Sequence, residues 1–437
     1  MDAIFRPLSV AVYGASRNPA KLGHTLLRNV LGGGFEGDVI AVNPAGGEVL
    51  GLATVPRLAR PVDLALISVP ADSAEAAVAD AVRARCAAAI VLASGFGETG
   101  AAGREVESRM AARARAAGMR LVGPNCMGVV SRSAPGFFNG SYFWRLPQRP
   151  GNISLVSQSG AFGGMFLAES RRRGLGVARF LSVGNSAEVV ETDALEWLAE
   201  DPATEVIGLF VEAFQQGRRF VEVARRCPKP VVVLKAGRLA AGARAAASHT
   251  GSLAGSRGAV TAAFRRGGVI ESGTSDDFFD SLQVLSARPP TAGRRIAIVT
   301  ISGGPSVLGA DAAERAGLEL PALAAKTVAE LRRLAPSFAA TGNPVDLTPQ
   351  CPPDHFQPAL RAVFTDPAVE GVVAINCGLD VQEFGLGLAQ AQRETGKPVT
   401  AFLLDVPQIE QHLRSAGLPV LPTPERAVAA YAALVPL

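Results

Sequence analysis

Short apolar segments alternate with longer helical segments along most of the chain. Within residues 1–132, the apolar runs are β-branched or aliphatic, each ends near Gly, Pro, Asn or Ser, and Ala/Arg-rich stretches separate them. These runs cover residues 10–13, 39–42, 64–69 and 89–92. Continuous apolar runs of this length, joined by helices, are typical of a parallel sheet buried on both faces. The pattern predicts a Rossmann-like α/β domain over residues 1–132.

The alternation stops at residues 133–150, where three prolines and an aromatic cluster predict an extended connection between domains. It resumes with apolar runs at residues 153–156, 178–181, 206–211 and 231–234. We interpret residues 151–286 as a flavodoxin-like domain. A second Pro-rich connection then leads to a third α/β unit over residues 295–437.

The third unit is similar in sequence to the second. A gapless alignment with a constant offset places Ile153-Ser-Leu-Val on Ile296-Ala-Ile-Val, and further matches follow in the same order. The matched segments are 153–160 with 296–303, 174–175 with 317–318, 201–205 with 366–370, and 229–231 with 397–399. Such order indicates duplication of one α/β unit. Features shared by both copies are interpreted as structural, and features of one copy as functional candidates.

Composition agrees with several packed domains. The 437 residues are 48% hydrophobic and 19% charged, which excludes a disordered chain, a coiled coil and a collagen-like fibre. At about 150 residues per domain, we expect about three domains. The five cysteines form no CxxC pair, so neither a disulfide framework nor a zinc site is predicted. The N-terminus lacks an apolar signal region and no membrane span is predicted, so we expect a cytoplasmic protein.

The net charge of +4 is small and comes mostly from arginine. The densest run, Arg171-Arg172-Arg173, is interpreted as a solvated helix end. Because a nucleic-acid partner would require clustered charges with interleaved aromatics, none is expected. Anionic small ligands explain the basic residues better.

His249 is the first candidate for chemistry. It lies among small residues at positions 245–255, where we predict an accessible loop, and it has no counterpart in the third unit. Because imidazole is nucleophilic near neutral pH, phosphoryl or acyl capture is plausible. Glu212 ends an apolar strand, aligns with Cys377, and would reach the sheet edge where α/β proteins bind ligands. It could orient an imidazole, or it could be an ordinary strand-end acid facing solvent.

Two turns are candidate anion sites. Residues 157–164 follow a predicted strand and open a helix, whose N-terminus favours phosphate. Residues 300–306 repeat this turn, so it could equally be structural. The turn at Gly14 lacks the GxGxxG spacing, and Asn43-Pro44 stands where a ribose-binding acid would be, which disfavours NAD. The neighbouring strand ends instead suit a phosphorylated adenosine ligand.

Five motifs together resemble the ADP-forming acyl-CoA synthetases, which are relatives of the succinyl-CoA synthetase α subunit. They are GASRNP (14–19), GPNCMG (123–128), SQSGAFG (157–163), SHTGSLAG (248–255) and NPVDLTP (343–349). The resemblance covers the whole chain and implies an N-terminal CoA-binding domain followed by two flavodoxin-like domains. It implies a reversible reaction in which carboxylate, CoA and ATP give acyl-CoA, ADP and phosphate through an acyl phosphate and a phosphohistidine.

By motif match, His249 is the phosphorylated residue, Glu212 its stabiliser, and Ser159, Gly160 and Ala161 the phosphate site. A phosphohistidine carries about two negative charges, which a helix N-terminus offsets. The residues that the resemblance assigns to CoA contact follow the strands of the first domain: Gly14, Ser16, Arg17, Asn43, Ser68, Val69, Pro70, Ser94, Gly95, Phe96 and Asn125. No metal ligand is expected in this chain.

Two departures from the family refine this expectation. No segment remains for an ATP-grasp domain, so ATP, ADP and Mg²⁺ are expected to bind a separate ATP-grasp β subunit in a hetero-oligomer. Succinyl-specific relatives carry tyrosine where this chain has Gly164, which argues against succinate and for another small carboxylic acid. The alternative is a non-catalytic CoA-binding regulatory module; a nicotinamide dehydrogenase is disfavoured.

Overall fold

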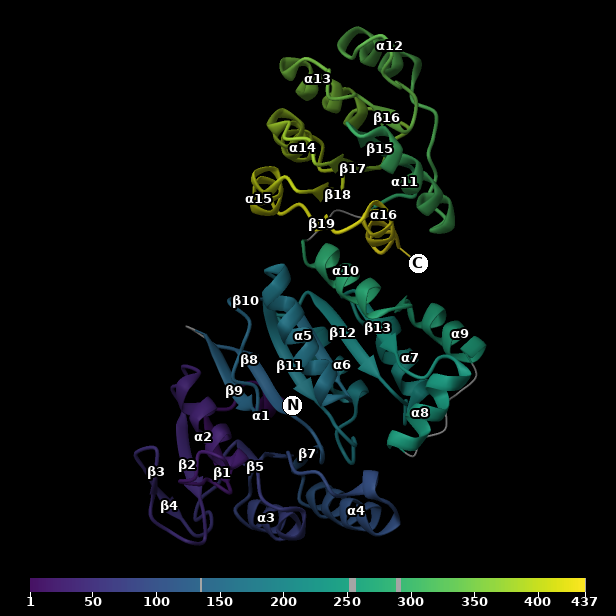
Figure 1. The fold of residues 1–437 in the computed structure, drawn as a ribbon. Helices are drawn as coiled ribbons and strands as arrows, with labels where there is room; N and C mark the ends of the chain where they lie inside the picture. Colours follow the sequence, from purple (N-terminus) through teal and green to yellow (C-terminus); the bar gives the residue numbers. More distant parts are fainter. Residues whose placement is uncertain (134–135, 251–256, 288–291, 437) are drawn as a thin grey trace. The chain divides into compact units, whose positions relative to one another are not determined.

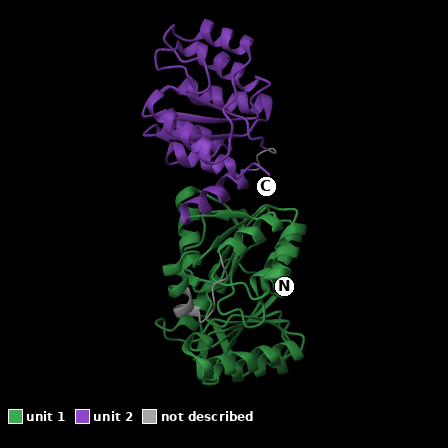
Figure 2. Cartoon of the chain, turned by 90° about the vertical axis from the view of Figure 1, so that its right-hand side faces the viewer, with its two compact units in different colours: residues 1–273 green, residues 274–437 purple. Residues whose placement is uncertain are grey.

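The computed structural model describes residues 1–133, 136–250, 257–287 and 292–436, and the side chains of residues 246–250 lie outside this description. The chain forms two compact units, Met1–Gly273 and Thr274–Leu437 (Figure 2). Three sheets, in which most neighbouring strands run parallel, alternate with helices along the chain (Figure 1). This confirms the predicted α/β class. The boundaries proposed for three separate domains stay a prediction.

The first sheet has the strand order β3-β4-β2-β1-β5-β6-β7. Each apolar run predicted in residues 1–132 forms one of its strands. The bounds are β1 Ser9–Tyr13, β2 Asp38–Val42, β3 Glu48–Val49, β4 Leu52–Val55, β5 Leu64–Ile67, β6 Ala88–Val91 and β7 Arg120–Val122. The helices are α1 Asp2–Phe5, α2 Leu22–Gly32, α3 Ala71–Arg83, the short η1 Gly97–Thr99 and α4 Ala101–Ala116. Because β1 pairs with both β2 and β5, the strand order reverses there, which is where α/β sheets bind ligands.

The second sheet has the order β14-β13-β12-β10-β11-β8-β9. Its strands are β8 Gly128–Arg132, β9 Phe137–Ser141, β10 Pro150–Ser157, β11 Val177–Ser182, β12 Val206–Val211, β13 Val231–Lys235 and β14 Ile270–Ser272. Its helices are α5 Gly160–Arg173, α6 Glu191–Glu200, α7 Gly217–Arg226, α8 Ala240–Thr250 and α9 Arg257–Gly267. The predicted extended connection at residues 133–150 was wrong in part, because β8 and β9 form an antiparallel hairpin on this sheet. Phe137 and Phe138 are buried there, so the aromatic cluster supplies core contacts.

The second unit contains a five-stranded parallel sheet with the order β16-β15-β17-β18-β19. Its strands are β15 Ile296–Thr300, β16 Val345–Asp346, β17 Gly371–Cys377, β18 Val399–Leu404 and β19 Val420–Leu421. Its helices are α10 Ser275–Ser286, α11 Gly303–Arg315, α12 Ala325–Leu334, α13 Pro353–Phe364, α14 Gln382–Thr395, α15 Pro407–Ser415 and α16 Pro424–Ala432. No helix in the described ranges is long and apolar enough to cross a bilayer.

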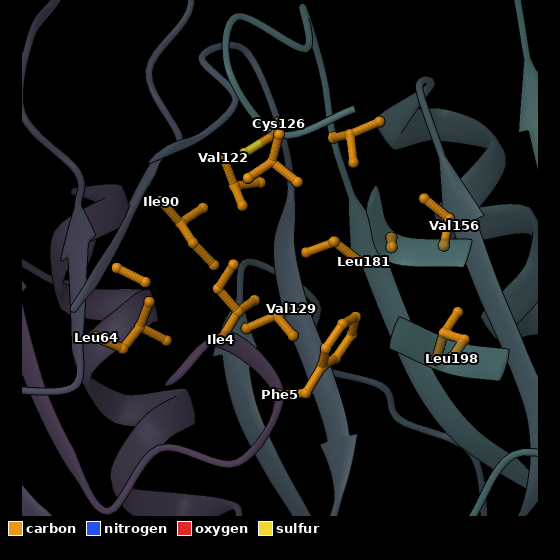
Figure 3. Close-up of a cluster of buried hydrophobic side chains, with 14 of the residues drawn as sticks. Ile4, Phe5, Leu64, Ile90, Val122, Cys126, Val129, Val156, Leu181 and Leu198 are labelled. Atoms are coloured by element: carbon orange, nitrogen blue, oxygen red, sulfur yellow. The ribbon is translucent and has the colours of Figure 1, made fainter. Parts of the chain in front are cut away.

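One continuous apolar core joins the first two sheets. Val122 and Ile90 of the first sheet belong to the same buried cluster as Val129 and Leu181 of the second (Figure 3). Phe5 of α1, which is 1% exposed, also belongs to it. Burying each such side chain stabilises a fold by about 1.5–3 kcal/mol. The edges of both sheets therefore meet as parts of one unit.

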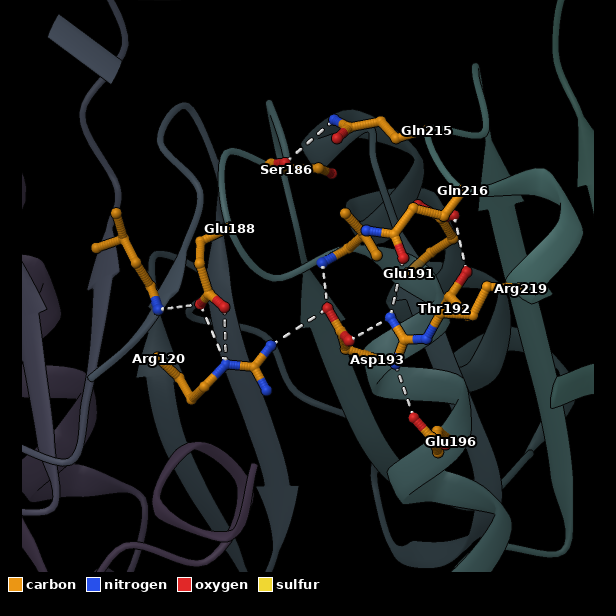
Figure 4. A network of polar contacts seen from close by, with 12 residues as sticks. Arg120, Ser186, Glu188, Glu191, Thr192, Asp193, Glu196, Gln215, Gln216 and Arg219 are labelled. Carbon is orange, nitrogen blue, oxygen red and sulfur yellow. Dashed lines mark hydrogen bonds and ion pairs between the residues drawn. The ribbon is translucent and has the colours of Figure 1, made fainter. Parts of the chain in front are cut away.

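An ion-pair network also links these sheets (Figure 4). Arg120 of β7 donates from Nε to Glu188 at 3.0 Å and pairs through Nη2 with Asp193 of α6 at 3.2 Å. Asp193 also accepts from Arg219 of α7 at 2.7 Å. Because each carboxylate has a cation and each arginine spans two elements, the network fixes α6 against the end of β7.

A contact between a lysine and a backbone carbonyl is repeated in the two sequence copies. Lys229 donates to the backbone carbonyl of Asp201 at 2.7 Å, and Lys397 donates to that of Asp366 at 2.9 Å. Asp201 and Asp366 are both buried. The repeated contact supports our interpretation that features shared by both copies are structural.

Candidate functional site

Glu212 directly follows β12, and its backbone is bound from two sides. Its N–H donates to Gln158 Oε1 at 2.6 Å, and its carbonyl accepts from Lys235 Nζ at 2.6 Å. Burial lowers the pKa of Lys235, and the neighbouring Glu212 opposes that shift. In the third-domain copy, which is the sequence repeat within residues 295–437, Cys377 and Leu403 stand in place of Glu212 and Lys235. The acid and its support are therefore specific to one copy.

Glu212 lines a cavity of about 240 Å³ between the carboxyl ends of the first two sheets. Most of the residues that line it have polar side chains, and they come from the segments that follow β6, β7, β10, β11 and β12. Its members are Gly97, Glu98, Arg104, Glu107, Asn125, Gln158, Gly184, Asn185, Ser186, Glu212, Ala213 and Gln215. Of these, only Glu212 and Asn125 are among the predicted site residues. The cavity brings one residue of the predicted CoA set into the same site as the predicted acid.

A carboxylate–amide cluster forms one wall of this cavity. Asn185 Nδ2 donates to Glu98 at 2.7 Å and to Glu107 at 3.0 Å, and Asn125 donates to Asn185 Oδ1 at 3.2 Å. Burial raises the pKa of Glu107. Burial would also raise the pKa of Glu98, but hydrogen bonds from the Gly95 N–H and Asn185 outweigh it and lower the pKa. Sequence analysis missed Glu107 and Asn185, because they lie in no recognised motif and meet only across two sheets.

His249 lies in the last turn of α8. The prediction of a loop at this position was wrong, because the preceding residues are alanine-rich and favour a helix. The His249 side chain lies outside the described residues. Helix α8 contacts η1, the turn that carries Glu98 of the cavity wall. The element that bears His249 therefore adjoins the site that Glu212 lines.

Helix α5 begins at the predicted phosphate site. Ser159 caps the helix by accepting from the Phe162 N–H at 3.3 Å, Gly160 is half-buried and Ala161 is exposed. In the third-domain copy, a Cβ built on Gly303 would lie 2.5 Å from Asp346 Oδ2. A carboxylate therefore lies against that helix N-terminus, where it would repel phosphate. The equivalent turn in the second sheet is the better anion site.

The predicted CoA residues lie at the carboxyl edge of the first sheet. Gly14 has φ +82°, and a Cβ there would lie 2.2 Å from the Ser68 carbonyl oxygen, so only glycine fits this turn. Asn43 shapes the same turn by donating to the Ala15 carbonyl at 2.6 Å. Ser16 is half-buried and Arg17 exposed. These residues surround the first βα turn.

The remaining predicted CoA residues differ in accessibility. Ser68 shares a 2.8 Å hydrogen bond with Tyr142, Val69 is half-buried, and Pro70, Ser94 and Gly95 are exposed. Phe96 is 1% exposed and belongs to the apolar core. Its side chain therefore packs in the core and is not available to a ligand.

Comparison with known proteins agrees with this arrangement. A CoA-binding domain family matches residues 8–132, a succinyl-CoA ligase-like flavodoxin domain family matches residues 150–285, and a ligase-CoA domain family matches residues 296–378. The chain is 35% identical to the ADP-forming acetate–CoA ligase II subunit alpha of Pyrococcus furiosus, with 100% of this chain and 97% of that protein covered.

Two further relatives extend the comparison. The chain is 38% identical to the ADP-forming acetate–CoA ligase I of Archaeoglobus fulgidus, but spans only 63% of its length. The solved structure of Ca. Korarchaeum cryptofilum acetyl-coenzyme A synthetase 1 with phosphate and ADP is similar, with a TM-score of 0.90 and 35% identity over 99% of this chain and 96% of that one. The chain belongs to the family of ADP-forming acyl-CoA synthetases and is of the α-subunit type.

Proposed function

We propose that the chain is the α subunit of an ADP-forming acyl-CoA synthetase. It would interconvert carboxylate, CoA and ATP with acyl-CoA, ADP and phosphate. The observation that carries this proposal is the cavity between the first two sheets, which Glu212 lines and which α8, the helix of His249, adjoins through η1. The likeness to whole α subunits supports the same conclusion.

His249 is the proposed phosphoryl carrier. Its ring nitrogen takes the γ-phosphoryl group of ATP with release of ADP, and then passes it to the substrate carboxylate to form an acyl phosphate. The CoA thiolate attacks the acyl carbon, and phosphate leaves. Glu212 would accept a hydrogen bond from the other ring nitrogen, which fixes the tautomer and stabilises the cationic ring. The N-terminus of α5 would hold the phosphoryl oxygens through the N–H groups of Gly160 and Ala161.

The CoA site is proposed at the carboxyl edge of the first sheet. The tight turn at Gly14 lets backbone N–H groups approach a phosphate closely, and exposed Arg17 supplies a cation. Asn125, which belongs to the proposed CoA residues, lines the same cavity as Glu212. A CoA thiol placed at Asn125 would reach an acyl phosphate beside Glu212.

A separate ATP-grasp subunit is the proposed partner and would bind ATP, ADP and Mg²⁺. The name of the Pyrococcus relative as a subunit alpha supports this division, and the longer Archaeoglobus relative is consistent with the same parts joined in one chain. We expect a hetero-oligomer.

The proposed acid is one other than succinate. Gly164 of α5 faces the Phe143 ring, since a Cβ built on Gly164 would lie 3.4 Å from that ring. An aromatic side chain from the β9–β10 connection therefore occupies the space beside the helix, and a tyrosine at position 164 would displace it.

The test is phosphoryl labelling with γ-³²P-ATP and Mg²⁺ in the presence of the candidate ATP-grasp partner. Wild type is compared with His249→Ala, and we expect acid-labile, base-stable label on the wild type alone. Label on both chains would place the phosphoryl group elsewhere. No label on wild type, although CoA binds and the partner associates, would favour the non-catalytic CoA-binding regulatory module.

A further inference from the structure

The Gln158 side chain makes four hydrogen bonds at the end of β12. Its Oε1 accepts from the N–H groups of Glu212 at 2.6 Å and Ala213 at 3.0 Å. Its Nε2 donates to the Ala213 carbonyl at 2.7 Å and to Glu191 Oε2 at 3.2 Å. The Gln158 amide therefore binds three backbone groups of Glu212 and Ala213, and it also contacts the carboxyl group of Glu191.

The orientation of this amide is determined by its surroundings. If Oε1 and Nε2 exchanged places, the amide N–H groups would face two backbone N–H groups, and its oxygen would face the Ala213 carbonyl and Glu191. Glu191 is 1% exposed and also accepts from Thr192 Oγ1 at 3.2 Å (Figure 4). The Glu191 carboxyl group thus binds Nε2 of Gln158, which leaves Oε1 facing the N–H group of Glu212.

The third-domain copy shows the same strand end without this amide. Ile301 stands in place of Gln158, and the Cys377 N–H donates instead to Ser302 Oγ at 3.0 Å. In the second sheet the serine equivalent to Ser302 is Ser159, whose hydroxyl caps α5. Gln158 therefore takes over the strand-end contact, which leaves Ser159 at the helix N-terminus. The amide is present in the copy that has Glu212 and absent from the copy that lacks it.

We propose that Gln158 is a positioning residue for Glu212 and that Glu191 orients the Gln158 amide. This rests on the proposed function, because it assigns Gln158 a part in presenting Glu212 to the imidazole of His249. Gln158 lies between the proposed phosphate site and β10, so its hydrogen bonds link the strand end that carries the acid to the loop that binds the anion. A small displacement between these groups would slow phosphoryl transfer.

The experiment is a double-mutant cycle on phosphoryl transfer. Gln158→Met keeps an unbranched side chain of similar size and removes the amide. We expect the single-turnover rate of labelling from γ-³²P-ATP, with the partner present, to fall about 10-fold to 100-fold, while the KM for CoA is unchanged. In a Glu212→Gln background the same substitution should cost less than about 3-fold, because a positioning residue has no effect once its target is lost.

Two further variants complete the test. Glu191→Leu removes the acceptor for Nε2 and should slow labelling in the same direction, whereas Glu191→Gln retains an acceptor oxygen and should recover most of the rate. Ile301→Met changes the twin position in the third domain and is the matched control, expected to label at the wild-type rate. Thermal unfolding of each variant monitors folding.

The outcomes separate this inference from the proposed function. If Gln158→Met slows labelling by the same factor with and without Glu212, its role is only structural and the inference is wrong. If it leaves the wild-type rate unchanged while Glu212→Gln slows labelling and His249→Ala abolishes it, the inference fails and the proposed function stands. If the wild type itself takes no label, the proposed function fails first.

Discussion

At the scale of single residues, backbone contacts decide where the candidate side chains lie. Glu212 is bound through its N–H by Gln158 and through its carbonyl by Lys235, so its backbone is held from two sides. Gly14 has a comparable role in the first sheet, because its turn leaves no room for a side chain. Sites built on such contacts keep their geometry when ligands bind and leave.

Gly14→Ala tests this tight turn. The added methyl would be 2.2 Å from the Ser68 carbonyl oxygen at φ +82°, so the turn must shift. We expect a loss of unfolding free energy larger than the about 1–2 kcal/mol that a left-handed conformation alone costs, and loss of stabilisation by CoA. Urea unfolding with and without CoA measures both.

The matched control for this prediction is Gly46→Ala. Gly46 has φ +68°, but a Cβ added there would have no atom of the described residues within 4 Å, so the variant carries the conformational cost without the clash. Equal losses at both positions would contradict the role assigned to the close approach at Gly14.

At the scale of elements, the apolar pattern was sufficient to predict most strands but not their partners. The runs that form β1, β5, β10 and β12 are short, continuous and bounded by turn residues, and each is a strand. The β8–β9 hairpin was missed because Pro135 and the glycines of residues 128–141 mask the pattern, and because β8 pairs with β11, which is distant in sequence.

The site was predictable to the same extent. Glu212 and Ser159 directly follow predicted strands, and alignment of the two sequence copies identified their counterparts, Cys377 and Ser302. Glu98 and Glu107 follow β6 of the first sheet, Asn185 follows β11 of the second, and only packing brings them together. No local pattern contains that information.

Asp201→Ala tests the element junction at the end of α6. Asp201 accepts from Arg179 Nε at 3.1 Å and from Thr204 at 2.8 Å, and Arg179 is 5% exposed. Because the variant leaves a buried guanidinium without its carboxylate, we expect a loss of about 3–5 kcal/mol in unfolding free energy. Chemical denaturation measures it.

The difference in unfolding free energy between wild type and Asp201→Ala depends on pH with a definite sign. Burial opposes ionisation of Asp201, but hydrogen bonds from Arg179 and Thr204 outweigh it and lower the pKa. The stabilisation is therefore fully present above the ordinary aspartate pKa of about 3.9 and is lost as the pH falls through the folded value. Wild type and Asp201→Ala should converge in unfolding free energy on acidification.

Asp366→Ala is the comparison at the equivalent position of the other sequence copy. The Asp366 carboxylate accepts from the backbone N–H groups of Ala324 and Ala368, so we expect its loss to lower the unfolding free energy by only about 1–3 kcal/mol.

At the scale of the whole molecule, the two compact units have separate apolar cores. One large cluster contains residues of the first two sheets, and another contains residues of β15, β17 and their helices. Separate cores permit separate unfolding.

Calorimetry tests this separation. We expect two transitions, of which CoA raises only the one that belongs to Met1–Gly273, where the proposed CoA residues lie. A ligand at 100 times its Kd stabilises its unit by about 2.7 kcal/mol. A single cooperative transition, or an equal CoA shift in both, would contradict the assignment.

The β8–β9 hairpin sets a limit on modularity. The CoA-binding family match ends at residue 132, which is the last residue of β8, yet this strand and β9 complete the second sheet. A recombination junction at that boundary would separate β9 from β8, the strand that joins β9 to β11 in this sheet. Exchange of CoA-binding domains between homologues, in evolution or in engineered chimeras, is therefore expected to succeed only when the crossover point spares residues 128–141, so that the hairpin is inherited with the sheet it completes.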